Sequence, residues 1–173
     1  MKKQKISIIA VGAHNMEMPI PHDNSNIVSS WDVLNGQEVT GDCVVIGGGL
    51  VGAETAEYLA NKGHQVTIVE MMDKIAAGES TTVLPLMMKD FADHNVKQLV
   101  NTKVDHIENN IVYTANEQIK ADTIINALGS KKNIFDDSSI TIPHVCVGDC
   151  SGERTADIAS AIRTAYKAAN EIG

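Results

Sequence analysis

The chain has 173 residues, of which 43% are hydrophobic, 21% are charged and only 3% are aromatic. This length accommodates one ordinary domain or two small ones, and a core poor in aromatic side chains is typical of an aliphatic parallel sheet covered by helices. The formal net charge of −8 disfavours a nucleic-acid-binding protein, because a phosphate backbone requires a basic patch.

The cysteines and the apolar runs indicate a protein of the reducing cytosol. The three cysteines are odd in number and lack dense spacing, which argues against a disulfide framework and a metal site. Residues 6–13 follow a basic start as in a signal peptide, but they are short for one, and a buried first strand explains them equally well. No run approaches the roughly 20 apolar residues of a membrane helix. We therefore expect a cytoplasmic protein without a membrane segment.

The first hundred residues alternate between strand-like and helix-like patterns. Short aliphatic runs bounded by turn signals indicate strands, and apolar residues recurring every three to four positions indicate helices. In chain order we predict a strand at 6–10, a loop or linker at 14–26, a short strand with one helical turn at 27–34, a strand at 43–46, a helix at 50–62, a strand at 66–70, a loop at 71–80, a helix at 81–94 and a strand at 96–100.

The remaining chain predicts a small meander, two further strands and a last helix. Asn109 and Asn110 form a two-residue turn within the meander. The last helix is amphipathic and carries its apolar residues on one side. The predicted elements are meander strands at 103–108, 111–114 and 118–120, strands at 122–127 and 145–147, a loop at 131–141, and a helix at 155–171 with Ile158, Ile162, Ala165 and Ala169 on its apolar side. The pattern predicts an α/β fold with a Rossmann-like parallel sheet, helices on both faces and a small antiparallel meander.

A glycine-rich turn lies between the strand at 43–46 and the helix that follows it. Its sequence matches the dinucleotide fingerprint, in which one glycine permits a tight turn, the next leaves room for the pyrophosphate and the last allows the helix to pack closely on the strand. Backbone N–H groups at such a helix start bind a pyrophosphate without basic side chains. The candidate cofactor-binding residues are Gly47, Gly48, Gly49, Leu50, Val51 and Gly52.

An acidic residue, Glu70, ends the next predicted strand. An acid roughly 20 residues beyond the glycines accepts hydrogen bonds from the adenosine ribose and repels a 2′-phosphate. The glycine turn and Glu70 therefore predict a site for NAD(H) in preference to NADP(H). The alternative is a structural glycine turn beside a solvated Glu70.

Three segments together resemble a known family. They are Val44 to Glu70, the stretch Ala127-Leu128-Gly129 and the stretch Val147-Gly148-Asp149-Cys150. They are similar to the flavoproteins with two dinucleotide-binding domains, of the pyridine nucleotide-disulfide oxidoreductase type. Within that group the chain most resembles the C-terminal part of NADH:flavin oxidoreductases of the 2-enoate and 2,4-dienoyl-CoA reductase type.

The resemblance implies further cofactor-binding residues. The strand end at Gly12 resembles an Ala-Thr-Gly motif, with Val11 where threonine is usual, and Gly148 and Asp149 resemble the motif whose aspartate binds the FAD ribitol. A helix starting near residue 155 would point its N-terminus at the flavin. Glu54 occupies a place where some relatives have an acid near the nicotinamide. The set implied by the resemblance is Gly12, Glu54, Gly129, Gly148 and Asp149.

The family inserts an NAD(H) domain into an FAD domain. By resemblance, residues 41–128 form the NAD(H)-binding domain, and residues 1–40 and 129–173 form the first and last pieces of a split FAD-type domain. The chain departs from the family because it has no second glycine fingerprint, no barrel for FMN and no cluster-binding cysteines. It resembles the C-terminal portion of a larger enzyme, as a truncated gene, a fragment or a small subunit would. The NAD(H) site is therefore complete, and an FAD site is incomplete.

These features predict the NAD(H)-binding module of an NADH-dependent flavoprotein oxidoreductase. Hydride transfer from NADH to a flavin requires no general acid or base from the protein, so we expect no catalytic side chain and no metal. One alternative is a non-catalytic module that binds NAD or ADP or serves in assembly. Another is a fragment that binds nothing and persists as a dimer. A half FAD domain leaves apolar surface uncovered, which predicts self-association or a flavin-bearing partner domain.

Overall fold

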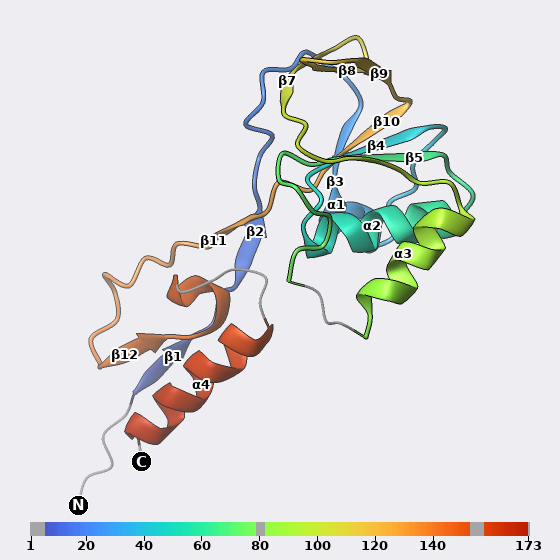
Figure 1. The fold of residues 1–173 in the computed structure, drawn as a ribbon. Helices are drawn as coiled ribbons and strands as arrows, with labels where there is room; N and C mark the ends of the chain where they lie inside the picture. The colour runs from blue at the N-terminus through green and yellow to red at the C-terminus, as the bar shows by residue number, and fades with distance from the viewer. Residues whose placement is uncertain (1–5, 79–81, 153–157, 173) are drawn as a thin grey trace, which may run out of the picture. The chain divides into compact units, whose positions relative to one another are not determined.

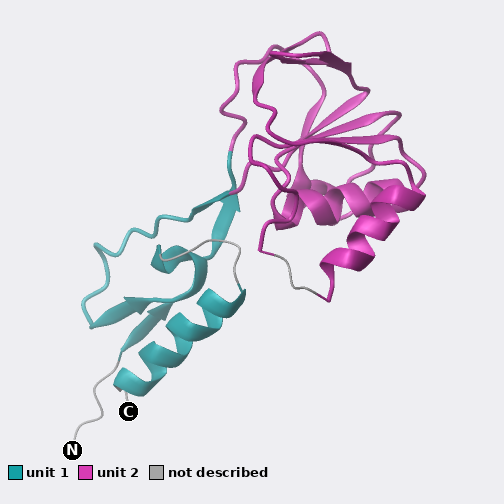
Figure 2. Ribbon diagram, viewed as in Figure 1, with its two compact units in different colours: residues 1–16, 130–173 teal, residues 17–129 magenta. Residues whose placement is uncertain are grey.

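The computed structural model describes residues 6–78, 82–152 and 158–172. The chain divides into two compact units (Figures 1 and 2), one of residues 17–129 and the other of residues 1–16 and 130–173. The start of the last helix near Thr155 lies outside the described residues. None of the helices in these ranges has the length and apolar character to span a bilayer.

A five-stranded parallel sheet forms the centre of the larger unit. The strand order is β3-β10-β4-β5-β6, and every neighbouring pair is parallel. All four residues of β4 and of β10 are buried, as in a strand covered on both faces. The strands are β3 (Ile27–Ser29), β4 (Cys43–Ile46), β5 (Val66–Val69), β6 (Lys97–Leu99) and β10 (Thr123–Asn126). Residues 17–40 thus fold with the larger unit, because β3 extends its sheet.

Three helices cover one face of this sheet: α1 (Ser30–Leu34), α2 (Leu50–Asn61) and α3 (Leu84–Asp93). Leu59 of α2 and Phe91 of α3 pack in one core cluster with Val45 and Ile68 of the sheet. Pro85 stands in the first turn of α3, where a missing N–H costs nothing. Helix α2 is followed by Gly63, whose φ of 91° lies in the left-handed region that glycine adopts freely.

The opposite face of the sheet is covered by the meander (Figure 1): β7 (Val104–Glu108), β8 (Ile111–Thr114) and β9 (Gln118–Lys120). Ile107, Val112 and Ile119 of the meander pack against Val44 and Ile46 of the sheet. The φ angles of 52° and 59° at the two asparagines between β7 and β8 suit a tight hairpin turn. The α/β fold with a parallel sheet and antiparallel strands is confirmed. In one detail it differs from the prediction, because the described helices of this unit lie on one face, not both.

The smaller unit contains a parallel pair of strands, an antiparallel pair and a helix. β1 pairs with β12, and β2 pairs with β11. The pair β2–β11 lies where the sequence predicts loops. These strands were not predicted because their polar residues lack an alternating apolar pattern. The elements are β1 (Ser7–Ile9), β2 (Ala13–Asn15), β11 (Ser130–Lys132), β12 (His144–Cys146), the 3-10 turn η1 (Gly148–Ser151) and α4 (Ile158–Ile172).

Helix α4 does not bury the side that its sequence marks as apolar. Ser160, Thr164 and Ala168 are buried, whereas Ile158 is 80% exposed and Ile162 is 65% exposed. The apolar stripe predicted from the periodicity is therefore present, but it faces away from the described residues of its own unit.

Candidate functional site

The glycine turn connects the end of β4 to the start of α2. Gly47 has a φ of 102°, and a Cβ at this position would lie 2.6 Å from the carbonyl oxygen of Ala127. A Cβ at Gly52 would lie 1.9 Å from the carbonyl oxygen of Gly47, so the helix touches the turn backbone to backbone. These contacts explain why the first and last glycines have no side chain.

The middle glycine, Gly49, has no such neighbour. It is the N-cap of α2 with extended backbone, and a Cβ on it would point into space free of atoms within 4 Å. No side chain caps the helix. The first N–H groups of a helix and its dipole favour an anion at this end. The turn therefore offers an open, electropositive backbone surface.

Glu70 lies at the end of β5 and is only 9% exposed. Its Oε2 accepts a hydrogen bond from the N–H of Gly48 at 2.6 Å, and its Oε1 accepts one from the N–H of Met72 at 2.7 Å. The carboxylate is thus held beside the glycine turn by two backbone donors. Each carboxylate oxygen can accept further bonds, so Glu70 remains able to receive a ligand hydroxyl.

The loop after β5 folds back over the glycine turn. The N–H of Ala76 donates to the carbonyl oxygen of Gly48 at 2.7 Å, and Ile75 is buried. A Cβ at Gly48 would meet the Cδ1 of Ile75 at 2.4 Å and the Cβ of Glu70 at 3.0 Å. A side chain at Gly48 would therefore displace Ile75, a contact that a loop prediction for residues 71–80 does not reveal.

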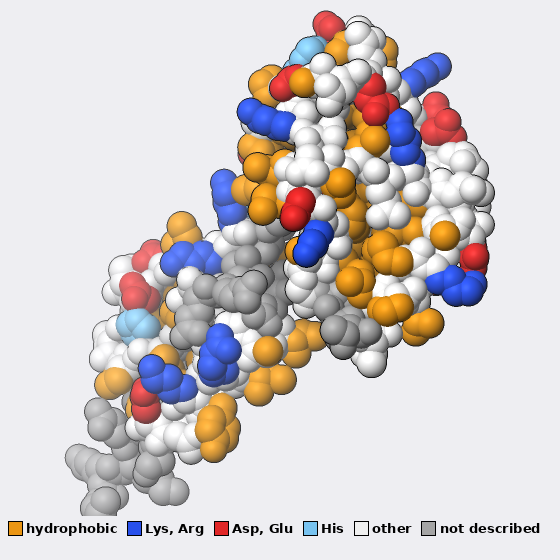
Figure 3. Space-filling model, viewed as in Figure 1, with side chains coloured by type: hydrophobic (Ala, Val, Ile, Leu, Met, Phe, Trp, Pro, Cys, Tyr) orange, Lys and Arg blue, Asp and Glu red, His pale blue; other side chains and the backbone are white. Residues whose placement is uncertain are grey.

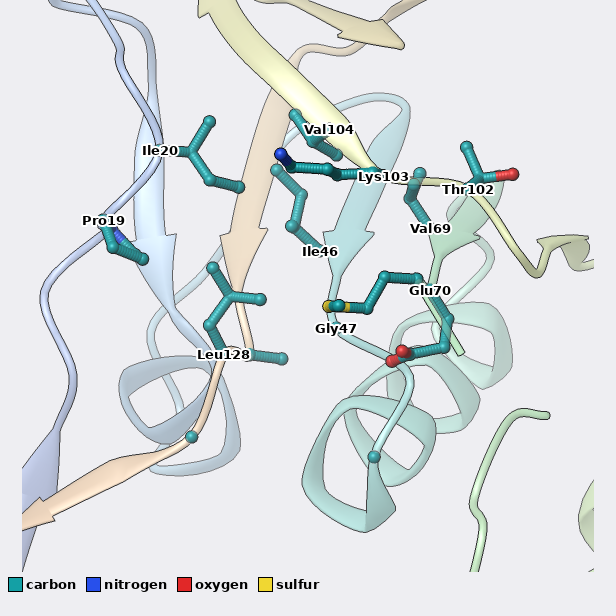
Figure 4. A pocket seen from close by; sticks show the side chains of 14 residues that line it. Pro19, Ile20, Ile46, Gly47, Val69, Glu70, Thr102, Lys103, Val104 and Leu128 are labelled. Carbon is teal, nitrogen blue, oxygen red and sulfur yellow. The ribbon is translucent and has the colours of Figure 1, made fainter. Parts of the chain in front are cut away.

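A cavity of about 450 Å³ opens above the turn, at the carboxyl ends of β4, β5 and β10 (Figure 4). Its volume lies within the usual range for small-molecule sites. Apolar side chains form most of its wall, and Glu70 is its acidic group. The lining residues are Pro19, Ile20, Ile46, Gly47, Gly49, Val69, Glu70, Met71, Thr102, Lys103, Val104, Ala127, Leu128 and Gly129.

One wall of this cavity, formed by Pro19 and Ile20, depends on a loop that is bound to the meander. The N–H of Ile107 donates to the carbonyl oxygen of Pro21, and Asp23 accepts from the N–H of Asn109 at 2.8 Å. The Ser25 hydroxyl and then the Asn109 N–H hold the pKa of the Asp23 carboxyl below its ordinary value. A lowered pKa means that the ionised carboxylate stabilises the folded state.

We expect Asp23→Ala to lower the thermal stability at neutral pH and to loosen this wall. The contribution of Asp23 is present above its pKa in the unfolded chain and is lost as the pH falls through the lower pKa of the folded state. Thermal unfolding of both proteins at neutral pH and at a pH well below the ordinary pKa of aspartate measures this difference, which should shrink as the pH falls through the lowered pKa of the folded state. Asp136→Ala is the matched control, because Asp136 has a similarly lowered pKa but lies in the smaller unit. Because the pKa of Asp136 is lowered as well, Asp136→Ala should show a pH dependence of the same sign but should leave the cavity wall, and so NADH binding, unchanged. A loss of stability in Asp23→Ala that is the same at every pH would contradict the expectation.

The predicted residues fall into two groups. The glycine turn, Glu70 and Gly129 come together around the cavity, and Leu50 and Val51 begin α2 beside it. Glu54 is exposed on α2 and is not part of the cavity lining.

Gly12, Gly148 and Asp149 lie in the smaller unit. Gly148 has a φ of 70°, and its N–H donates to Thr164 Oγ1 at 2.8 Å. Sequence reasoning did not find Pro19, Ile20 or Lys103. Val104 carried a signal only as an apolar strand residue, and Leu128 only as part of the stretch Ala127-Leu128-Gly129 that resembles the family.

The chain matches one protein family and several known proteins. The profile of a family described as pyridine nucleotide-disulphide oxidoreductase matches residues 3–144. The bilirubin reductase of Mediterraneibacter gnavus (strain CC55_001C) is 44% identical over 174 residues, covering 95% of this chain and 27% of that protein. A dihydrolipoyl dehydrogenase of Bacillus subtilis (strain 168) is 28% identical over 134 residues, covering 73% and 29%.

A solved structure of 2-naphthoyl-CoA reductase in complex with 2-naphthoyl-CoA superposes with a TM-score of 0.80 at 27% identity. The match covers 94% of this chain and 26% of that chain. The chain therefore spans between about a quarter and a third of the length of these relatives.

Proposed function

The chain belongs to the pyridine nucleotide-disulphide oxidoreductase family, and from this premise we propose that residues 17–129 bind NAD(H) and present its nicotinamide to a flavin. The observation that carries the proposal is the pairing of an uncapped helix start at Gly49 with the buried Glu70 beside it. A dinucleotide needs both features, because its pyrophosphate is anionic and its ribose hydroxyls are hydrogen-bond donors.

Each part of the site has a distinct binding role. The N–H groups at the start of α2 hold the pyrophosphate, and the open space at Gly49 lets it approach the backbone. Glu70 accepts hydrogen bonds from the adenosine ribose. Because Glu70 is an acceptor without a proton to donate, a 2′-phosphate in its place would meet a like charge, so NADH is preferred over NADPH.

The chemistry itself comes from the cofactors. When bound, NADH supplies a hydride and a flavin receives it, so the protein contributes binding, orientation and exclusion of water. The apolar wall of Ile46, Val69 and Val104 keeps part of the cavity dry. We assign no general acid or base.

The flavin side of the proposal rests on the smaller unit. Gly148 and Asp149 form the turn η1 after β12, and by family resemblance Asp149 would contact the FAD ribitol. The glycine fingerprint of this sequence belongs to the other unit. We therefore propose, from the family resemblance at Gly148 and Asp149, that the smaller unit is part of an FAD-type domain.

The packing of the smaller unit supports this assignment. Within its described residues the parallel sheet has two strands, although parallel strands are normally buried within larger sheets. Hydrophobic side chains lie along α4 (Figure 3), where Ile158, Ile162 and Tyr166 are all more than half exposed. An apolar surface of this kind marks an interaction site. We expect a flavin-bearing partner domain to cover it, and self-association is the alternative.

A non-catalytic module that binds NAD or ADP is the second candidate function. The glycine turn and Glu70 favour it, because they hold a dinucleotide whether or not a flavin is bound nearby. The two candidates share the dinucleotide site and differ in the flavin.

Thermal unfolding of the purified chain with millimolar NADH, NADPH or ADP tests the site. We expect NADH to raise the melting temperature by several degrees and NADPH to raise it less, because a ligand that binds the folded state stabilises it. A yellow protein favours the flavoprotein reading, and a colourless protein that responds to NADH favours the binding module. If none of NADH, NAD and ADP raises the melting temperature, both candidate functions are refuted.

A further inference from the structure

A single lysine, Lys103, lines the cavity above the glycine turn. It stands between Thr102, whose N–H donates to the carbonyl oxygen of Glu70 at 2.9 Å, and Val104, the first residue of β7. Figure 4 shows its side chain extending into the cavity over Ile46, from the meander side and opposite the glycine turn. The start of the meander therefore places an ammonium group in the space that the proposed function assigns to a dinucleotide.

The charges around the cavity make Lys103 distinctive. Among the described residues that line the cavity, it is the only basic one. No carboxylate of the described ranges forms an ion pair with its Nζ, whereas Lys89 and Lys97 each pair with an acid elsewhere on this unit. The cavity's own carboxylate, Glu70, has its oxygens turned to the backbone donors of Gly48 and Met72.

A bound dinucleotide would bring two phosphate charges into this space. A helix start offers about half an elementary charge, and its donors reach the phosphates from one side only. In a chain with a net charge of −8, the exposed Lys103 at the edge of the cavity adds a positive charge that attracts an anionic ligand. Lysine is a well-attested phosphate ligand that acts as a point charge at the end of a flexible stem.

We propose that Lys103 binds the pyrophosphate of the dinucleotide from the side opposite the glycine turn. The inference rests on the proposed function and adds a residue to that site. The backbone of the turn holds one side of the diphosphate, and Lys103 holds the other side. Lys103 therefore strengthens the binding of ligands that carry a diphosphate and does not affect the binding of a nucleoside without phosphates.

Calorimetric binding of NADH, ADP and adenosine to the full chain tests this role. Lys103→Met keeps the unbranched stem and removes the charge, and Lys103→Arg restores a charge. We expect Lys103→Met to weaken the binding of NADH and ADP about tenfold, because one charge-assisted contact is lost. The affinity for adenosine should be unchanged. The dependence of NADH affinity on salt should also become less steep. Lys103→Arg should bind close to wild type.

Lys120→Met is the matched control, because it removes the same charge from β9 outside the cavity. Unchanged NADH affinity in Lys103→Met would overturn the inference and leave the proposed function standing. An equal loss for adenosine and ADP would also overturn it, because Lys103 would then pack on the base. If the wild-type chain binds neither NADH nor ADP, the proposed function itself fails, and the inference fails with it.

Discussion

Glu70→Ala is expected to weaken NADH binding by about 10- to 100-fold, the value of one or two hydrogen bonds to a charged group. The same change should remove the preference for NADH over NADPH, because the carboxylate that repels a 2′-phosphate is gone. It should also destabilise the larger unit by about 2–4 kcal/mol, since the N–H groups of Gly48 and Met72 lose their acceptors. Calorimetry with both cofactors measures the first two effects, and denaturant unfolding measures the third.

Glu70→Gln separates the two roles of this residue. A neutral amide keeps the size of the side chain and an oxygen that accepts from one of the two backbone donors, so it should restore part of the stability. It should not restore discrimination against NADPH, which depends on negative charge. A folded Glu70→Ala protein with the wild-type preference for NADH would show that the adenosine ribose is not held at Glu70.

Gly52→Ala is expected to destabilise the larger unit by about 3 kcal/mol or more, at the upper end of the range for overpacked cores. The added Cβ would lie 1.9 Å from the carbonyl oxygen of Gly47, and a backbone atom cannot rotate away as a side chain can. Helix α2 must therefore shift from β4, and the donors at its start move with it. We expect a lower melting temperature together with loss of NADH binding.

Gly49→Ala is the matched control within the same turn. Its φ of −64° suits alanine, and the added Cβ would meet no atom within 4 Å. The variant should fold with wild-type stability yet bind NADH weakly, because the methyl group occupies the space of the pyrophosphate. Wild-type stability in Gly52→Ala would show that α2 does not pack against the turn as tightly as the backbone contact indicates. Wild-type binding in Gly49→Ala would mean that the phosphates lie elsewhere.

The part of the site that the sequence predicted is contiguous in the chain. The strand at Cys43–Ile46, the glycine turn, helix α2 and Glu70 at the end of β5 form one strand–helix–strand unit, and the structure contains these elements within a residue or two of the predicted bounds. Local rules are sufficient here. A glycine with positive φ, an apolar strand and an amphipathic helix each depend on residues only a few positions apart.

The parts that were missed depend on contacts between distant segments. The cavity wall at Pro19 and Ile20 exists because Asp23 binds a meander turn more than eighty residues further along. The polar strands β2 and β11 pair across an even larger separation and show no apolar alternation. Lys103 is unremarkable in the sequence, and only its position at the start of β7 brings it into the cavity.

The sequence by itself therefore determined the parallel sheet, the glycine turn with Glu70 and the apolar stripe of the last helix, because each follows from local periodicity or spacing. The tertiary structure decided which surface covers each face. The meander, rather than a helix, covers the second face of the sheet, and α4 buries Ser160 and Thr164 while Ile158 and Ile162 stay exposed. A periodic pattern shows that a face is apolar, but what packs against it depends on which distant segments fold into the same unit.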